Sequence, residues 1–497
     1  MAATNRFLWV LCWLGVISAA MWSGLAQAER VHRFTVSIDP ELKQIDVKAC
    51  FDGQPPATLV AESLDATIAL ISVRNDATGK EIRPSGYIPL KSVAGNGCVT
   101  YRVDVSRPVL RHDRTGGKIR RVGTDVAISA GLWLWRPENP DADADVELAF
   151  DLPDGIAVSV PWLPVDGADR PTFRLGRTPV DWPAWTAFGR FTESEVEVAG
   201  SKLRIAVLDG SPPVDVASIT DWVADAAGMV GGLYGRFPYP WAQVLVVPNA
   251  RAREPAPWAF VVRGGGPGVH FVINQRRAME EFYDDWTAAH EFSHLFLPLV
   301  DSRDAWLSEG VATYYQNVLR ARSGRMTAQE AWSDLHAGFD RGRSQARNFT
   351  LAEATRRMHR SRFFMRVYWS GTAIAMLADI RLRKISNGSQ SLDTALAALN
   401  ACCLDMRREW RARELFARLD ELTGTTVFID LLNEHVESTR FPDLSETYDD
   451  LGLVPAGRRS VRLQSDAPLA GLRDSIMTGE ASILLHASSE FPVINNQ

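Results

Sequence analysis

The chain has 497 residues, a length that usually forms about two to four domains rather than one compact core. Hydrophobic residues make up 46% of it and charged residues 23%, and this composition excludes a disordered or fibrous protein. The formal net charge of −6 gives no reason to expect a nucleic acid as a partner.

The first 28 residues have the features of a secretory signal peptide. Arg6 precedes an apolar stretch, residues 7–22, and residues 25–28 (Leu-Ala-Gln-Ala) offer small side chains where a signal peptidase cleaves. We therefore predict cleavage after Ala28 and export, either to a periplasm or into the medium. The alternative is an uncleaved membrane anchor. No later stretch is apolar for long enough to span a bilayer, so we expect no membrane span after cleavage.

The cysteines fit an exported chain. Cys12 lies in the predicted signal, so four cysteines remain, and they allow three pairings. We favour a bridge between Cys50 and Cys98, because both fall in a strand-rich region; two buried thiols are the alternative. Cys402 and Cys403 are adjacent in sequence, which is unfavourable geometry for a bridge between them.

Residues 29–204 carry the pattern of a β-rich N-terminal domain. Apolar and polar residues alternate over short segments, as expected for strands with one buried face, at residues 32–38, 99–105 and 146–152.

Residues 205–330 mix helical and strand patterns. Residues 214–234 have apolar positions at helical spacing, and short apolar segments predict buried strands at 243–247, 259–262 and 269–273. Helical patterns then dominate as far as about residue 437, which predicts a helical domain over residues 331–453. The last segment, residues 454–497, looks weakly structured and partly strand-like, and its role is open.

The segment His290-Glu291-Phe292-Ser293-His294 carries the strongest chemical signal in the chain. It lies in a run of good helix-forming residues without Gly or Pro. Residues four apart lie on one face of a helix, so His290 and His294 can bind the same metal ion. Glu291 is then placed to contact a metal-bound water rather than the metal. The alternative is a pair of histidines that only cap or pack within a helix.

A catalytic zinc ion usually has three protein ligands and one position left for water. Glu309, in a second helical segment after a short loop, is the predicted third ligand; an ordinary surface carboxylate is the alternative. Such a site lowers the pKa of bound water to about 7. Glu291 would take a proton from this water and pass it to the leaving amine.

These residues resemble the gluzincin peptidases, and the M61 family of glycyl aminopeptidases more closely than the related M1 aminopeptidases. M61 members carry a Trp-x-x-Glu-Gly-x-x-x-Tyr-Tyr-like segment, which is matched by Trp306, Glu309 and the pair Tyr314-Tyr315. Both families carry a later Tyr-x-x-Gly at the start of a helix, matched by residues 368–371. In these families the tyrosine is the transition-state donor, so the resemblance implies that role for Tyr368; a packed aromatic is the alternative.

The resemblance extends over residues 33–453 and implies a multidomain α+β fold. Its parts would be a β-rich N-terminal domain, a thermolysin-like zincin catalytic domain and a helical C-terminal domain, with one zinc ion as cofactor.

The chain departs from these families in the strand that borders the cleft. That strand usually carries a glycine-rich motif ending in a glutamate, which binds the free amino group of the substrate. The matching residues here, 263–270, include no acid. Gly265, Gly266 and His270 are the candidate substrate-binding residues, with a glycine turn and a structural histidine as alternatives.

The motifs together predict a zinc-dependent peptidase that hydrolyses peptides or proteins in an exported compartment. Whether it is an aminopeptidase or an endopeptidase stays open, because the amino-group glutamate is missing. The alternative from another class is an exported binding or scaffold protein that keeps a gluzincin fold without catalysis.

Overall fold

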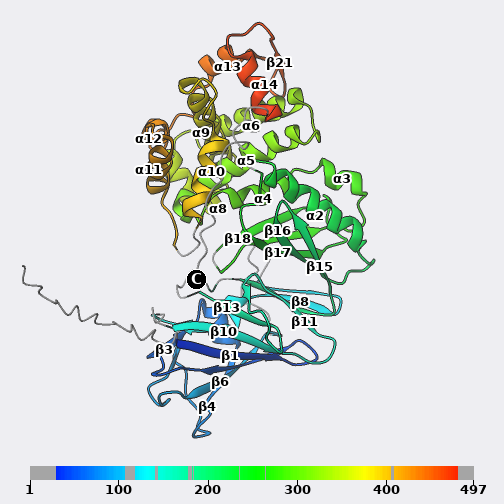
Figure 1. The fold of residues 1–497 in the computed structure, drawn as a ribbon, viewed down its shortest axis with the longest axis vertical. Helices are drawn as coiled ribbons and strands as arrows, with labels where there is room; N and C mark the ends of the chain where they lie inside the picture. The colour runs from blue at the N-terminus through cyan, green and yellow to red at the C-terminus, as the bar shows by residue number, and fades with distance from the viewer. Residues whose placement is uncertain are drawn as a thin grey trace, which may run out of the picture.

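The computed structural model describes residues 30–106, 118–139, 144–176, 182, 184–233, 235–263, 265–404 and 408–479. The predicted signal peptide, residues 1–28, lies outside the described residues. Within the described ranges, no helix combines the length and the apolar character needed to cross a membrane. The molecule is elongated, with a β-rich part at one end and a helix-rich part at the other (Figure 1).

The N-terminal part is built around a seven-stranded sheet of order β12-β13-β10-β1-β2-β6-β4. At its centre, β1 (Arg30–Ile38) runs parallel to β10 (Ala144–Asp151) and antiparallel to β2 (Gln44–Cys50). The three segments predicted from alternation all lie in this sheet. Its remaining strands are β4 (Leu70–Asn75), β6 (Cys98–Asp104), β12 (Leu163–Pro164) and β13 (Thr172–Leu175).

Two smaller sheets and one short helix complete this part. The four-stranded sheet has the order β11-β14-β8-β7 and the three-stranded sheet the order β5-β3-β9. Together with the seven-stranded sheet they enclose one hydrophobic core, in which Trp133, Trp135 and Trp162 are fully buried. The bounds are α1 (Leu64–Ala69), β3 (Thr58–Val60), β5 (Tyr87–Pro89), β7 (Ile119–Val122), β8 (Asp125–Ser129), β9 (Arg136–Pro137), β11 (Ala157–Ser159) and β14 (Trp185–Gly189).

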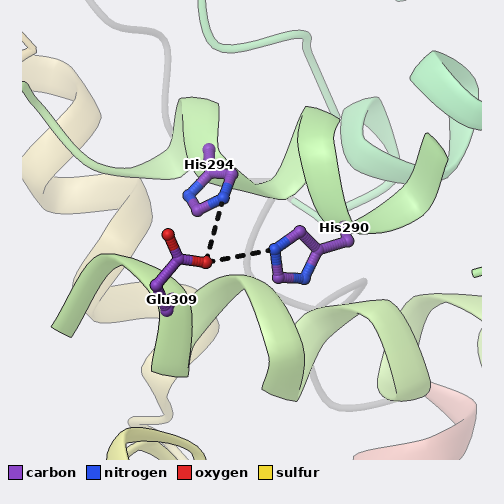
Figure 2. A group of neighbouring side chains, drawn as sticks. All are labelled: His290, His294 and Glu309. Atoms are coloured by element: carbon purple, nitrogen blue, oxygen red, sulfur yellow. Dashed lines mark ion pairs between the residues drawn. The ribbon is translucent and has the colours of Figure 1, made fainter. Parts of the chain in front are cut away.

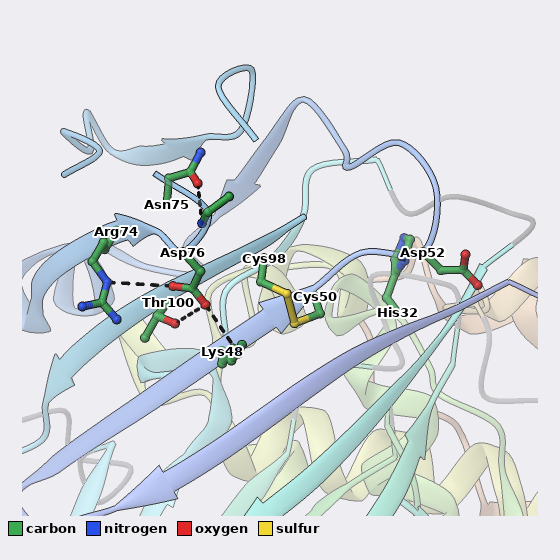
Figure 3. The surroundings of a disulfide bond; sticks show 10 residues. His32, Lys48, Cys50, Asp52, Arg74, Asn75, Asp76, Cys98 and Thr100 are labelled. Carbon is green, nitrogen blue, oxygen red and sulfur yellow. Dashed lines mark hydrogen bonds and ion pairs between the residues drawn. A yellow bond between two sulfur atoms is a disulfide. The ribbon is translucent and has the colours of Figure 1, made fainter. Parts of the chain in front are cut away.

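The predicted bridge between Cys50 and Cys98 is present and joins β2 to β6 (Figure 3). The two cysteines are directly opposite in the register of the strand pair. Nearby, Thr100 Oγ1 donates a hydrogen bond to Asp76 Oδ2 at 3.0 Å. The bridge closes a sequence separation of 48 residues. By the chain-entropy account, that closure stabilises the fold by about 4 kcal/mol.

The expectation for the adjacent cysteines was wrong, because the structure joins Cys402 to Cys403. The two cysteines are the last residues of α10 (Leu392–Cys403). The last carbonyls of a helix have no backbone partner to lose, so the peptide between the two cysteines can adopt the geometry that the ring requires.

The second part begins with a five-stranded sheet of order β15-β16-β17-β19-β18. Its three inner strands are parallel, and the two outer strands run antiparallel to them. The strands are β15 (Thr192–Val198), β16 (Ser201–Val207), β17 (Trp241–Pro248), β18 (Trp258–Val262) and β19 (Gly268–Ile273). The predicted boundary between residues 204 and 205 falls inside β16; because β15 pairs with β16, this sheet begins earlier, at β15.

Helices cover this sheet and extend away from it (Figure 1). The predicted boundary between residues 330 and 331 falls inside α6 (Ala328–Ser344). One hydrophobic core contains residues of both the sheet and the helices that follow, so the predicted catalytic and helical regions pack against each other. The bounds are α2 (Val216–Gly231), α3 (Met279–Asp284), α4 (Thr287–Ser293), α5 (Ala305–Arg322), α7 (Leu351–Arg356), α8 (Met358–Ser361), α9 (Phe364–Ile385), α11 (Ala412–Thr423) and α12 (Val427–His435).

The segment after residue 453 is more regular than expected. A two-stranded sheet, β20 (Leu453–Pro455) with β21 (Val461–Leu463), follows α13 (Ser445–Leu451), and a helix, α14 (Ala470–Thr478), closes the described chain. Two apolar residues of α14, Ile476 and Met477, belong to the large core. The sequence did not predict this helix, because its two and a half turns are too short to show a clear period.

Candidate metal centre and active site

The two histidines of the central motif come from the end of α4. The helix ends at Ser293, and His294 begins a short 3-10 turn, His294–Phe296. A compact loop then leads to α5, which carries Glu309. Because both histidines keep right-handed helical geometry, their rings still face the same side.

His290, His294 and Glu309 converge on one point (Figure 2). Glu309 Oε2 lies 3.3 Å from His290 Nε2 and 3.6 Å from His294 Nε2. One ligand atom from each of the three residues lies within 4.8 Å of the others. The structure therefore brings together all three residues that the sequence predicted as metal ligands.

Each histidine is oriented through its other ring nitrogen. His290 Nδ1 lies 2.9 Å from Gln316 Oε1, and His294 Nδ1 lies 3.0 Å from Ser308 Oγ. An amide oxygen can only accept, so His290 Nδ1 carries the proton and Nε2 keeps its lone pair for a ligand. Sequence analysis missed both partners. Only their positions relative to Glu309 could have revealed them. Gln316 lies two helical turns after Glu309, and Ser308 immediately precedes Glu309.

Arg263, directly after β18, contacts the residues that carry and orient His294. Its guanidinium donates to the backbone oxygen of His294 at 2.6 Å and to Ser308 Oγ at 3.1 Å. The hydroxyl oxygen of Ser308 has two lone pairs, so it can accept from Arg263 and from His294 Nδ1 together. Arg263 is 8% exposed, and it was not predicted as a site residue.

Burial and neighbouring charges shift the ionisation of the cluster. Burial lowers the pKa of His294 to about 3, which keeps this imidazole neutral, the form that binds metals. Burial also lowers the pKa of His290, but the neighbouring carboxylates of Glu309 and Glu291 outweigh it and raise the pKa overall. Burial raises the pKa of Glu309, yet the nearby imidazoles of His294 and His290 and the hydroxyl of Tyr368 bring it to about 2.

Glu291 behaves differently from Glu309. Burial raises the pKa of Glu291 to about 7, against the opposing charges of His290 and Arg263. A carboxyl group with this pKa can both accept and release a proton at neutral pH. At neutral pH the carboxyl group of Glu309 therefore stays ionised, whereas that of Glu291, with a pKa of about 7, can gain or lose a proton.

The cluster fits a zinc ion. Ligand atoms about 2.0–2.1 Å from a tetrahedral zinc lie about 3.4 Å apart, close to the separations of Glu309 Oε2 from the two Nε2 atoms. Glu309 Oε2 is buried and, among the described residues, has no hydrogen-bond partner. Such an atom is costly to bury unless something compensates it, and a cation at this point would do so.

Tyr368 faces the same centre from α9. Its ring lies parallel to that of His290, with an interplanar angle of 4° and centroids 6.0 Å apart. Two glycines allow α9 to approach α5 this closely. A Cβ on Gly310 would lie 2.3 Å from the backbone of Gly371, and a Cβ on Gly371 would lie 1.9 Å from Trp306 O. The glycines of both motifs therefore bring Tyr368 to Glu309.

The three residues predicted to bind substrate lie outside the cavity beside the histidine–glutamate cluster. Gly266 has a φ of +125°, and an added Cβ would lie 2.1 Å from Pro161 O, so contact with the N-terminal domain explains this glycine. His270 is buried and stacks on Phe260, with ring centroids 4.5 Å apart. Gly265, Gly266 and His270 are not among the described residues that line the cavity beside the cluster.

That cavity has a volume of about 460 Å³ and three walls. The N-terminal domain contributes Lys118, Ser129 and Trp185. The edge strand β18, with its first four residues, forms the second wall. His359 and Tyr368 lie on the third, and the histidine–glutamate cluster forms the floor. The strand that borders the site is therefore β18, and it carries no acidic residue.

Comparison with known proteins gives structural matches only. No protein-family model matches the chain, and no curated protein matches it. An aminopeptidase N family protein from Idiomarina loihiensis superposes with a TM-score of 0.59 at 14% identity, over 89% of this chain and 78% of that one.

An M1 zinc metallopeptidase from Deinococcus radiodurans superposes with a TM-score of 0.53 at 16% identity, over 84% of this chain and 94% of that one. A mutant of the D. radiodurans enzyme bound to a Tyr-Ser-Ala substrate gives 0.52 at 16% identity, with 84% and 95% covered. The chain has an M1-type fold. This fold combines a β-rich N-terminal domain with a helix-rich C-terminal part, as the sequence predicted.

Proposed function

We propose that this protein is a zinc-dependent peptidase in which His290, His294 and Glu309 hold the metal. The observation that carries the proposal is the convergence of these three side chains on one buried carboxylate oxygen that lacks a hydrogen-bond partner. Both histidines have their other ring nitrogen in contact with a side-chain oxygen, and a cavity of about 460 Å³ opens beside them. The M1-type fold supports the same assignment.

Glu291 acts as general base and then as general acid. A zinc ion in this site supplies positive charge that lowers the pKa of a water molecule and polarises a substrate carbonyl. Glu291, adjacent in sequence to His290 and lining the cavity, accepts the proton of the attacking water and passes it to the leaving amine. Burial raises the pKa of Glu291 above that of an ordinary carboxyl group, which makes it a stronger base.

Tyr368 donates a hydrogen bond to the oxyanion that forms on the carbonyl. Burial raises the pKa of its hydroxyl, and the charges of Glu309 and Glu291 raise it further, so the group stays protonated and able to donate. Its place on the cavity wall, parallel to the ring of His290, supports this role.

Motifs beyond the metal site favour an M61-like peptidase. Gly310 and the pair Tyr314-Tyr315, which follow Glu309 in the M61-like segment, support this subfamily, although β18 lacks the acid that would bind a free amino group. We therefore leave the exopeptidase and endopeptidase modes to a digest of peptides with free and blocked amino termini.

We further propose that the protein works outside the cytoplasm. The signal-like residues 1–28 and the bridge between Cys50 and Cys98 support export, because such bridges persist mainly in oxidising compartments.

The deciding experiment combines metal analysis with a peptide-library digest. We expect one zinc ion per chain and cleavage by the parent. Glu291→Gln should retain zinc but lose activity on the order of a thousandfold, because the base is gone while the ligands remain. Glu280→Gln, an exposed carboxylate on α3, is the matched control. A metal-free protein that takes up no zinc would instead favour the binding or scaffold role.

A further inference from the structure

The ionisable side chains that line the cavity are unevenly charged. Outside the metal centre, its base and Tyr368, they are Lys118, Arg263 and His359, all of them basic. Among the described lining residues, only Glu291 and Glu309 are acidic. A substrate ammonium group would find no carboxylate of its own in this cavity, whereas a substrate carboxylate would meet cations on two sides.

Lys118 offers an ammonium group that is available for binding. Its Nζ forms an ion pair with Asp65 Oδ2 at 3.8 Å, a separation beyond hydrogen-bonding distance that leaves its N–H groups able to donate. Across the described ranges, Nζ has no hydrogen-bond acceptor, and its side chain is 30% exposed. The backbone of Lys118 is held, because Ser129 N donates to its carbonyl oxygen at 2.8 Å. The group is therefore partly desolvated, anchored on the N-terminal wall and free to donate.

Arg263 adds a second positive charge behind the cavity. Within the described part of the chain, its guanidinium donates only to neutral oxygens, those of His294, Leu297 and Ser308. A divalent metal in the centre would be balanced by the carboxylates of Glu291 and Glu309, which leaves the charge of Arg263 uncompensated. An anionic group in the cavity would reduce that imbalance.

We propose that this cavity binds a carboxylate of the peptide substrate at Lys118 and does not require a free amino terminus. The carboxylate belongs either to an acidic side chain or to the carboxyl terminus of the peptide. Trp258 and Phe260 on the edge strand provide an apolar surface for the neighbouring substrate residue. This inference rests on the proposed peptidase function, because it names the substrate class of the same site.

The test uses matched peptides and the zinc-loaded full chain. An N-acetylated, C-amidated library carries Glu, Gln or Lys at each position around the cleaved bond, and a second set compares a free carboxyl terminus with its amide. Both cleavage and equilibrium binding are measured, the latter by fluorescence anisotropy on Glu291→Gln. We expect the carboxylate peptide to be favoured about tenfold over its amide counterpart, the scale of one charge-assisted hydrogen bond. The two sets identify which carboxylate is recognised.

Substitutions at Lys118 decide the assignment. Lys118→Met should abolish the preference, and Lys118→Glu should shift it toward the Lys peptide. Lys91→Glu, an exposed lysine of the same domain that does not line the cavity, should leave it unchanged. Equal affinity for Glu and Gln peptides in the parent, a strict need for a free amino terminus, or a preference that survives Lys118→Met would overturn the inference.

The two proposals fail in different ways. If peptides are cleaved without regard to charge, the peptidase function stands and the carboxylate site is wrong. If no peptide is cleaved although zinc is bound, the peptidase function fails, and the anisotropy measurements still decide whether Lys118 selects carboxylates.

Discussion

Helix α5 carries two buried groups of ionisable side chains that differ in how completely they are paired. Around Glu309, the histidines leave a carboxylate oxygen without a hydrogen bond and face a cavity. One to two turns further along, Tyr314 and Tyr315 donate to Asp379 at 2.8 Å and to Asp393 at 2.7 Å. The first group lies where α4, α5 and α9 meet the cavity, whereas the second lies among α5, α9 and α10.

In the second group, the acidic side chains are paired with basic side chains. Arg383 donates to both aspartates, and Arg322 pairs with Asp393 at 2.8 Å. The two guanidinium groups thus balance the two carboxylates, all of them buried or nearly so. Complete pairing makes a buried group structural, and incomplete pairing beside a cavity makes it a candidate for binding or catalysis.

The largest effect on stability is expected in the paired group. Asp379→Ala removes the acceptor for Tyr314, Arg383 and the backbone N of Leu392. The free energy of unfolding should fall by about 3–5 kcal/mol, because the buried guanidinium of Arg383 loses one of its two carboxylate partners and Tyr314 loses its acceptor. Chemical denaturation measures it. Zinc affinity per folded molecule should be unchanged; a loss of zinc binding without a loss of stability would contradict the division between the groups.

Tyr368→Phe tests the unpaired group, and its expected effect on kcat, expressed as a free energy, is nearly as large. Loss of the hydroxyl should lower kcat by about a hundredfold to a thousandfold, corresponding to about 3–4 kcal/mol. Zinc content and unfolding free energy should stay the same, since the ring keeps its packing on His290. Steady-state kinetics on a cleaved library peptide gives the value, and an unaffected kcat would leave Tyr368 as a packed aromatic.

Gln316→Ala should weaken zinc binding, with a smaller change in free energy than the two substitutions above. Without the Gln316 oxygen, His290 loses the partner that fixes its ring, and the zinc dissociation constant should rise about tenfold to a hundredfold. Competition with a chelator measures this change. Gln329→Ala serves as control, because Gln329 lies on α6 and does not contact the metal ligands. Equal zinc affinity in Gln316→Ala and the parent would show that the hydrogen bond does not tune the site.

The smallest expected effect is a pH dependence of stability from the paired group. Burial raises the pKa of Asp393, but Arg322 and Arg383 outweigh it and leave the pKa below its usual value. Its contribution is therefore complete above about pH 4 and is lost as pH falls through the lowered folded value. Asp393→Asn should be less stable than the parent at pH 7, with the difference shrinking in acid. A constant difference across this range would be evidence against the lowered pKa.

Much of the site was predictable because its chemistry is local. His290, Glu291 and His294 lie within five residues, and helical spacing alone directs both rings to one side. Ser308 and Gln316 were missed, because a serine and a glutamine have no distinctive pattern until the ring nitrogens that they contact are known. His270 was misplaced for a related reason, since a histidine in an apolar strand has the same sequence whether its face meets a cavity or, as here, Phe260.

Local sequence predicted six of the strands, the helix over residues 214–234, the helix-rich region that follows, and the candidate ligands and base, because each pattern depends mainly on residues a few positions apart. Tertiary structure alone decided which glycines serve close helix packing, that the helical region shares one core with the sheet, and that the cavity walls are basic. These features depend on residues far apart in the chain, such as Lys118 and Arg263, and only the packing of the two parts brings their side chains to a common cavity.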